Sequence, residues 1–419
     1  MLTTFFVRPS VLARLESGPA GPYLPAFASQ LQQQRYAPDT IRQYLRSVDA
    51  FGRWLHAQGV LLTELEDHHL TRYLAHVGRR PLRARAQGGS PHAAAALPPF
   101  LTVLRSHGVL TLPCVLLALT PAEQWLHRFS AHLRDLRGLA PLTCQGYLFF
   151  VRRFLTASGR TQAPDWLPLQ AEELSEFVRR EAAGRRGGGR KRPGTALRAF
   201  VRFLVTHGEA PAGLEAVILT PREWAHANVP PHFSQGEIVQ MLAAANNGSA
   251  IGRRNHAILL LLARLGLRAQ EVGQLRLEDI GWMEGRLLIR STKSHRVREL
   301  PLPQEVGVAL VTYLQHGRPQ SPSRAVFLQH RAPFGPLQSS STIAKIVRWA
   351  LAQAELETHA SGAHALRHTA ASHLVQRGVS FKTVADILGH QSLQTTAIYA
   401  KLDLPALAAV ALPWPGGAA

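Results

Sequence analysis

The sequence predicts a mainly α-helical protein with a small β-sheet, in which a duplicated helical front half precedes an α+β domain. Apolar residues of the front half recur at spacings of three and four, the period of a helix face, and the same pattern returns about a hundred residues later. Farther along, two short segments flank a polar turn, which is typical of a β-hairpin. At 419 residues the chain is too long for one core, so two or three domains are expected.

The composition favours a polyanionic partner. Lys and Arg total 47 against 27 Asp and Glu, a net charge of +20, and such a charge attracts nucleic acid over long range. Charge alone leaves open a ribosomal-type or merely soluble basic protein. The apolar content of 46% is enough to fill several cores.

Cysteine usage and hydropathy indicate a cytoplasmic protein. Cys114 and Cys144 are the only cysteines, so a disulfide framework is not expected. Apolar stretches such as residues 257–262 are too short to span a bilayer. The N-terminus lacks the pattern of a signal peptide, so no membrane partner is expected.

The front half contains two copies of one helical module. An Ala-Pro pair at residues 37–38, and again at 140–141, precedes a Thr that suits a helix start. Gly59 and Gly159 suit the ends of these helices. The equivalent apolar pairs are Tyr44 and Tyr147, Leu45 and Leu148, Val48 and Val151, Phe51 and Phe154, Phe100 and Phe200, and Leu104 and Leu204.

Basic residues follow the helices and loops of both copies. The glycine-rich segment 184–193 is expected to lack regular structure and to form a mobile basic loop suited to phosphates, although a merely solvated loop is the alternative. Residues 79–90 of the first copy are also basic and loose. The candidates for contact with nucleic acid are Arg42, Arg46, Arg152, Arg153, Arg185, Arg186, Arg190, Lys191 and Arg192.

The second half begins with a capped helix start at residues 234–237. An apolar helix over residues 255–265 follows and ends at Gly266, just before Arg268. Arg268 can offer two parallel hydrogen bonds to phosphate oxygens, with Glu271 orienting it. Taken alone, an Arg-Glu pair at helical spacing is better read as a surface ion pair.

A β-hairpin is predicted next, with strands over residues 286–290 and 296–302 and Lys293 near the turn. A helix then opens at His364, and the spacing of three places His364 and Arg367 on one face. Another helix, over residues 379–388, leads to His390 and Tyr399.

Zinc is a competing interpretation of the histidines. His364 and His368 are four residues apart, and His373 and His390 follow. No carboxylate or cysteine completes a closed set of ligands, and His368 is expected to turn partly inward as helix packing. We therefore predict no metal site.

Together these motifs resemble the tyrosine recombinases, also called the phage-integrase family. The resemblance rests on Gly-Leu-Arg-x-x-Glu at residues 266–271, on the hairpin lysine, on His-x-x-Arg at 364–367, and on the spacing of nine from His390 to Tyr399. Each piece is weak alone, but the whole set is specific. It implies a site-specific recombinase that cleaves and rejoins DNA through a 3′-phosphotyrosine and a Holliday junction, without cofactor or catalytic metal.

The resemblance also implies residue roles. Arg268 and Arg367 would clamp the scissile phosphate, Lys293 would protonate the leaving 5′ oxygen, and Tyr399 would be the nucleophile. His364 would be a proton acceptor or hydrogen-bond partner near the nucleophile, and His390 would hydrogen-bond the phosphate. Glu271 would orient Arg268.

The domains expected from the resemblance are an additional core-binding-like domain (1–117), a core-binding domain (118–222), a catalytic domain (223–401) and a C-terminal tail that docks on a neighbouring subunit (402–419). Double-stranded DNA is the expected partner, four protomers act in the synapse, accessory proteins are left open, and the protein would be nucleoid-associated. The extra module favours a mobile-element recombinase over one that resolves chromosome dimers.

Three rival classes remain open on the sequence. A type IB topoisomerase shares the tyrosine chemistry, but the duplicated front half favours a recombinase. A non-catalytic DNA-binding relative is disfavoured because the six catalytic positions are intact. A structural or RNA-binding basic protein explains the charge but not the spacings.

Overall fold

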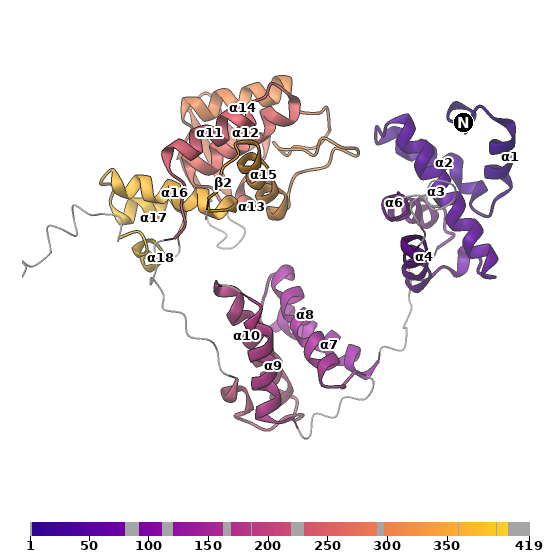
Figure 1. The fold of residues 1–419 in the computed structure, drawn as a ribbon, viewed down its shortest axis with the longest axis horizontal. Helices are drawn as coiled ribbons and strands as arrows, with labels where there is room; N and C mark the ends of the chain where they lie inside the picture. Colours follow the sequence, from indigo (N-terminus) through magenta and orange to yellow (C-terminus); the bar gives the residue numbers. More distant parts are fainter. Residues whose placement is uncertain are drawn as a thin grey trace, which may run out of the picture. The chain divides into compact units, whose positions relative to one another are not determined.

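The fold is described from a computed structural model (Figure 1). It describes residues 2–79, 92–110, 120–161, 169–185, 187–218, 230–290, 297–358, 360–390 and 392–400. Packing groups residues 112–227 into one compact unit and the rest of the chain into another. Separate hydrophobic cores belong to the first copy, the second copy and the C-terminal half.

The first copy is a helical bundle. Its helices are α1 (Pro9–Ser17), α2 (Leu24–Gln33), α3 (Pro38–Ala57), α4 (Asp67–Arg79) and α6 (Ala93–Ser106). Pro38 stands in the first turn of α3, where its missing N–H is not needed. The core includes Phe27 and Phe100, whose rings meet edge to face with centroids 5.4 Å apart.

The second copy repeats this packing with α7 (Pro121–Ala131), α8 (Pro141–Ala157), α9 (Ala171–Ala183) and α10 (Arg192–Thr206). Helix α8 packs on α10 as α3 packs on α6. Phe154 and Phe200 are buried here, as Phe51 and Phe100 are in the first copy. The predicted duplication of a helical module is therefore confirmed.

The expected basic loop is partly helical. Residues Gly187–Lys191 form a 3₁₀ helix that runs directly into α10, so the prediction of no regular structure is wrong there. Pro193 lies in the first turn of α10, where its fixed φ favours the helix. Arg186 and residues 80–91, the counterpart in the first copy, lie outside the described residues.

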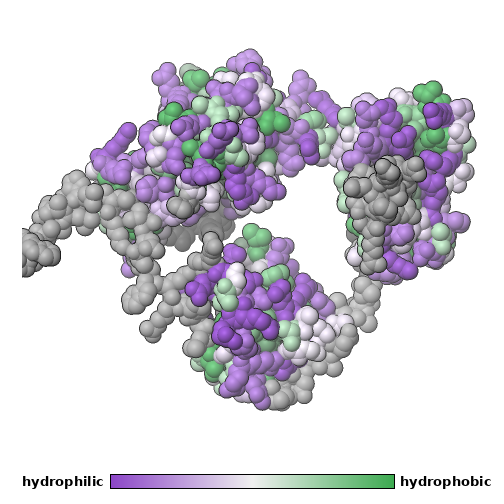
Figure 2. All heavy atoms as spheres, in the orientation of Figure 1, coloured by the Kyte–Doolittle hydropathy of each residue, from purple (hydrophilic) through white to green (hydrophobic). Residues whose placement is uncertain are grey.

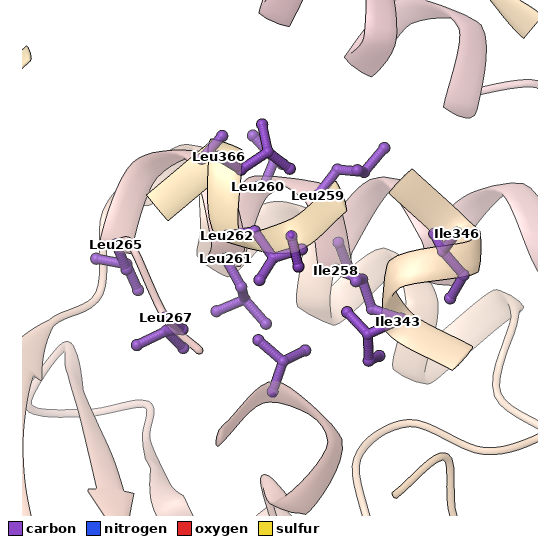
Figure 3. Packing of buried hydrophobic residues seen from close by; sticks show 14 of the residues in the cluster. Ile258, Leu259, Leu260, Leu261, Leu262, Leu265, Leu267, Ile343, Ile346 and Leu366 are labelled. Carbon is purple, nitrogen blue, oxygen red and sulfur yellow. The ribbon is translucent and has the colours of Figure 1, made fainter. Parts of the chain in front are cut away.

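The C-terminal half surrounds one central helix, α12 (Ala250–Leu265). It packs against α11 (Gln235–Ala245), α14 (Gln304–His316) and α16 (Gly362–Gln376), and every residue from Ala257 to Ala263 is buried. Figure 3 shows Ile258, Leu260 and Leu261 of this helix in one cluster with Ile343, Ile346 and Leu366. The run from Ala257 to Ala263 is apolar on all sides of the helix, which suits a place in the middle of a core.

Local signals fix both ends of α12. The helix begins at Ala250, five residues before the predicted start, because the Ser249 hydroxyl accepts a hydrogen bond from the Gly252 N–H. It ends at Leu265 because Gly266 adopts φ 61°, in the left-handed region. The capping box predicted at Ser234 and Glu237 is confirmed.

A small antiparallel sheet flanks this core. Its order is β1 (Ile280–Gly281), β2 (Arg286–Arg290), β3 (Val297–Pro301), with Leu287 opposite Leu300 and Ile289 opposite Arg298. The predicted hairpin strands are confirmed, although β3 ends at Pro301, one residue before the predicted end. Its turn, with Lys293, lies outside the described residues.

The remaining helices are α13 (Ala269–Gln274), α15 (Ser340–Gln353), α17 (Phe381–Leu388) and α18 (Leu393–Ala397). Helices α16, α17 and α18 follow one another and pack together (Figure 1). The face of the molecule seen in Figure 2 is mostly hydrophilic. Within the described residues, no helix combines the length and apolarity needed to cross a bilayer.

Candidate active site

Arg268 is held at the start of α13 by a buried carboxylate. Its Nη1 donates to Glu271 Oε1 at 2.8 Å, and its backbone N–H donates to Glu271 Oε2 at 2.9 Å. Its Nη2 donates to the Gly389 carbonyl at 2.9 Å. The predicted orienting role of Glu271 matches this geometry, since the carboxylate fixes both the backbone and the side chain of Arg268.

A second arginine, Arg298 on β3, shares the same carboxylate. Arg298 donates two parallel hydrogen bonds to Glu271, of 3.0 and 2.9 Å, and a third to the Ile387 carbonyl at 3.0 Å. Burial alone would raise the pKa of Glu271, but the hydrogen bonds and charge of Arg298, followed by those of Arg268, hold it below its usual value. Glu271 is therefore a carboxylate at neutral pH.

Arg298 is a positioning residue that our sequence reasoning missed. Nothing in the local sequence pattern shows that Arg298 reaches Glu271, 27 positions away. The only signal for this role in the sequence is a basic residue on the strand that follows the hairpin turn.

Arg367 lies on α16 and is 2% exposed. Its Nη1 donates to the Gly266 carbonyl at 2.7 Å and its Nη2 to the Leu388 carbonyl at 2.6 Å. Burial, followed by the charge of Arg268, lowers its pKa to about 10, so it stays protonated at neutral pH. Arg268 and Arg367 thus hold successive carbonyls, of Gly389 and Leu388, at the C-terminal end of α17.

His390 follows that helix end directly. Gly389 adopts φ 63°, which turns the chain back, and His390 Nδ1 lies 2.7 Å from Thr396 Oγ1. Burial, followed by the charges of Arg367 and Arg268, lowers the pKa of His390 to about 4. The imidazole is neutral at neutral pH, and the contact with Thr396 fixes its orientation.

Tyr399 is 1% exposed, and its hydroxyl lies 2.6 Å from His368 Nδ1. Burial raises the pKa of Tyr399 to about 12, only partly offset by Arg367. Burial likewise lowers the pKa of His368 to about 4, helped by His364 and Arg367. The pair is therefore a neutral phenol against a neutral imidazole.

His368 turns partly inward, as the sequence predicts, and it also contacts Tyr399. Residues four apart on a helix share a face, so His364 and His368 stack with ring centroids 4.5 Å apart, and His368 is the one that reaches Tyr399. His364 keeps an exposed edge. Partial desolvation of its ring and then the charges of Arg367 and Arg268 lower its pKa.

Of the predicted catalytic residues, five are described: Arg268, His364, Arg367, His390 and Tyr399. They come from the start of α13, from α16 and from the segment after α17, and they gather around the end of α17. Two guanidiniums and two neutral imidazoles beside a phenol can bind a phosphodiester and support its attack by the phenol oxygen. No three His, Cys, Asp or Glu side chains of the described ranges are grouped closely enough to hold a metal ion.

Arg42 and Arg46 lie on α3 and Arg152 and Arg153 lie on α8, as predicted, and three of these four form ion pairs. Arg152 donates to both oxygens of Glu123, at 3.2 and 3.1 Å, and Arg153 pairs with Glu181 at 2.7 Å. More than half of each of these two arginine side chains remains exposed. Arg42 pairs with Asp39, Arg46 lies over the ring of Phe6, and Arg185 pairs with Glu181; Arg190, Lys191 and Arg192 are exposed or half-buried.

Two family profiles match the chain. The Phage integrase family profile matches residues 232–404, and the Phage integrase, N-terminal SAM-like domain profile matches residues 24–87. The second match lies in the first helical copy, which the sequence predicts to be an additional core-binding-like domain.

Individual proteins align over most of the chain. The integrase/recombinase y4rA of Sinorhizobium fredii is 33% identical over 97% of this chain and 97% of its own length. Tyrosine recombinase XerC of Oceanobacillus iheyensis is 28% identical over 66% of this chain and 91% of its own length. The structure of a lambda integrase tetramer bound to a Holliday junction is 16% identical with a TM-score of 0.52, covering 73% of this chain and 86% of that one; it shows a shared fold.

Proposed function

We infer that this chain, which belongs to the phage integrase family of tyrosine recombinases, uses the constellation around the end of α17 to cleave and rejoin DNA at specific sites. The observation that supports this use is the meeting of Arg268, Arg367, His390 and Tyr399 around that helix end. These residues are separated by more than 130 positions of sequence.

The proposed cleavage is a phosphoryl transfer. Tyr399 Oη attacks the scissile phosphorus, an Oη–P bond forms, and the P–O5′ bond breaks. Arg268 and Arg367 stabilise the charge on the non-bridging oxygens, and neutral His390 donates a hydrogen bond to the phosphate. We assign the proton for the leaving 5′ oxygen to Lys293, which lies in the sequence between strands β2 and β3.

Rejoining is the reverse transfer. A 5′ hydroxyl of the partner duplex attacks the phosphotyrosine, which regenerates Tyr399 and exchanges the strands. Because the phosphodiester is conserved as a phosphotyrosine ester, the exchange needs no nucleotide triphosphate. We propose that four protomers act together through a Holliday junction, by analogy with the lambda integrase tetramer of the same fold.

We propose that residues 118–222 and 223–401 both contact the core DNA site, with the exposed arginines of α8 on the DNA backbone. Residues 1–117 form an additional DNA-contacting module, supported by the SAM-like profile match. Residues 402–419 dock on a neighbouring protomer. The protein would act on DNA in the cytoplasm, at the nucleoid.

The test uses DNA from the flanks of the gene, nicked near the cleavage site so that cleavage becomes irreversible. The wild-type chain is expected to form an SDS-resistant protein–DNA complex, and Tyr399→Phe is expected to form none. Tyr147→Phe, a change to a half-buried tyrosine of the second copy, serves as the matched control and is expected to retain the complex. A complex that survives Tyr399→Phe would contradict the assignment.

A further inference from the structure

We propose that His368 takes the proton of the Tyr399 hydroxyl during strand cleavage, and is thus a catalytic residue as well as part of the α16 helix. The proposal rests on the proposed function and deepens it. Its first support is contact with the reacting atom: His368 Nδ1 lies 2.6 Å from Tyr399 Oη.

The fold holds both His368 and Tyr399 in the positions that this contact needs. His368 is one turn beyond His364 on α16, and the backbone of the same turn is fixed because Ser372 Oγ donates to the His368 carbonyl at 2.8 Å. Tyr399 comes from the turn after α18, packed against Val375, Val384 and Leu388. Since the phenol is 1% exposed, solvent does not offer a competing proton acceptor in this arrangement.

Burial, followed by nearby charges, keeps the imidazole of His368 unprotonated. Facing His368 are His364 and Arg367 of the same helix, His232 from the segment before α11, and His390 after α17. Burial and these groups lower its pKa to about 4, so the ring is unprotonated at neutral pH. In the tautomer that carries its proton on Nε2, the neutral ring presents a lone pair at Nδ1, and the Tyr399 hydroxyl can donate to it.

The proton balance is closed. As the Oη–P bond forms, the phenol oxygen loses its basicity and its proton passes to Nδ1. The P–O5′ bond breaks, and the 5′ oxygen receives a different proton from the opposite side. On rejoining, the protonated His368 returns its proton to Tyr399 as the Oη–P bond breaks.

A simple tether is the competing role: the contact would only hold the phenol ring in place. His368→Asn distinguishes the two roles, because its side-chain oxygen can accept a hydrogen bond near the position of Nδ1 but cannot take the proton at neutral pH. His373→Gln, on the same helix and also half-buried, is the matched control.

The experiment measures the rate of adduct formation on nicked DNA. We expect His368→Asn to slow it by about 100-fold or more, the usual size of a general-base effect, while DNA binding and His373→Gln remain close to wild type. Replacing Tyr399 by a ring-fluorinated tyrosine, whose phenol has a lower pKa, should shrink the His368→Asn defect. A tether predicts that the defect is unchanged.

The results distinguish a failure of the proposed function from a failure of the role given to His368. No adduct from the wild-type chain would overturn the proposed function. An adduct formed by His368→Asn at the wild-type rate, or a defect that fluorination does not reduce, would overturn the role of His368 alone.

If His368→Asn does not fold, fluorination of Tyr399 with His368 intact remains decisive. If the proton passes to His368 in the same step that forms the Oη–P bond, fluorination should change the rate of adduct formation little. A rise of several-fold for about one unit of phenol pKa would mean that Tyr399 ionises without His368 and would contradict the proposal.

Discussion

At the scale of single residues, the site depends on one buried carboxylate. Glu271 is 6% exposed and binds two arginines, of which Arg298 is also largely buried. A buried pair of this kind leaves an uncompensated charge when one member is removed. The two partners lie on different elements, so the pair joins the sheet to the start of α13.

Glu271→Ala should therefore destabilise the fold by about 3 kcal/mol. Chemical denaturation at neutral pH measures the change. Glu299→Ala is the control, since Glu299 forms an ion pair with Arg286 in which both side chains are more than half exposed. That control should cost less than about 1 kcal/mol, and equal losses in the two variants would contradict the account.

The same carboxylate predicts a dependence on pH. The pKa of Glu271 is lower in the folded chain than in the unfolded chain, so its stabilising contribution is present above the unfolded value of about 4.3 and is lost as pH falls through the folded value. The stability difference between wild type and Glu271→Gln should be constant from pH 8 to about pH 5 and shrink in more acid solution. A stability difference that instead grows as the pH falls would mean that folding raises the pKa of Glu271, and it would contradict this prediction.

The site residues that the sequence predicts correctly are those whose positions follow from local spacing. Arg268, Glu271, Arg367, His390 and Tyr399 could be named from the sequence because each stands at a fixed distance from a helix end or from another motif residue. The bond of His368 to Tyr399 could not, since it joins positions 31 apart whose meeting depends on how α16, α17 and α18 pack.

At the scale of elements, the end of α17 organises the site. Its last carbonyls accept hydrogen bonds from Arg268, Arg298 and Arg367, and the left-handed Gly389 turns the chain toward His390. A Cβ at Gly389 would lie 2.7 Å from Arg298 Nη1. Both the backbone conformation and the space at this position therefore require glycine.

Gly389→Ala should displace Arg298 and abolish detectable adduct formation, with a loss of stability of about 1–3 kcal/mol from the strained backbone. Gly285→Ala is matched to it, because Gly285 has φ 60° but nothing within 4 Å of an added Cβ. That variant should lose comparable stability and keep the wild-type cleavage rate. If both glycine variants lose cleavage, backbone strain alone explains the loss, and the contact with Arg298 does not.

Element boundaries were predicted where capping residues mark them. Ser234 and Gly266 gave the start of α11 and the end of α12 correctly. The 3₁₀ helix at residues 187–191 was missed because three consecutive glycines have no helical preference. It forms because α10 continues it and because α9 packs against it.

At the scale of the whole molecule, a net charge of +20 and two helical copies predict that electrostatic attraction supplies much of the affinity for DNA. If the two copies and the catalytic half together contact about six to ten phosphates, affinity should fall by about 10³- to 10⁵-fold between 50 and 200 mM salt. Filter binding at several salt concentrations measures the slope.

The duplicated copies can be compared by the same slope. Arg152→Ala in the second copy and Arg42→Ala in the first should each reduce it by about one if both copies contact the backbone. A slope altered only by Arg152→Ala would leave the first copy without backbone contact at this position, and would count against its proposed role as a DNA-binding module.

The central claim is that Tyr399 forms the covalent bond to DNA. The most direct measurement is to digest the protein–DNA adduct with protease and nuclease and to identify the modified peptide by mass spectrometry. We predict a nucleotide attached through its 3′ phosphate to Tyr399. A nucleotide on another residue, or one attached through its 5′ phosphate, would contradict the account.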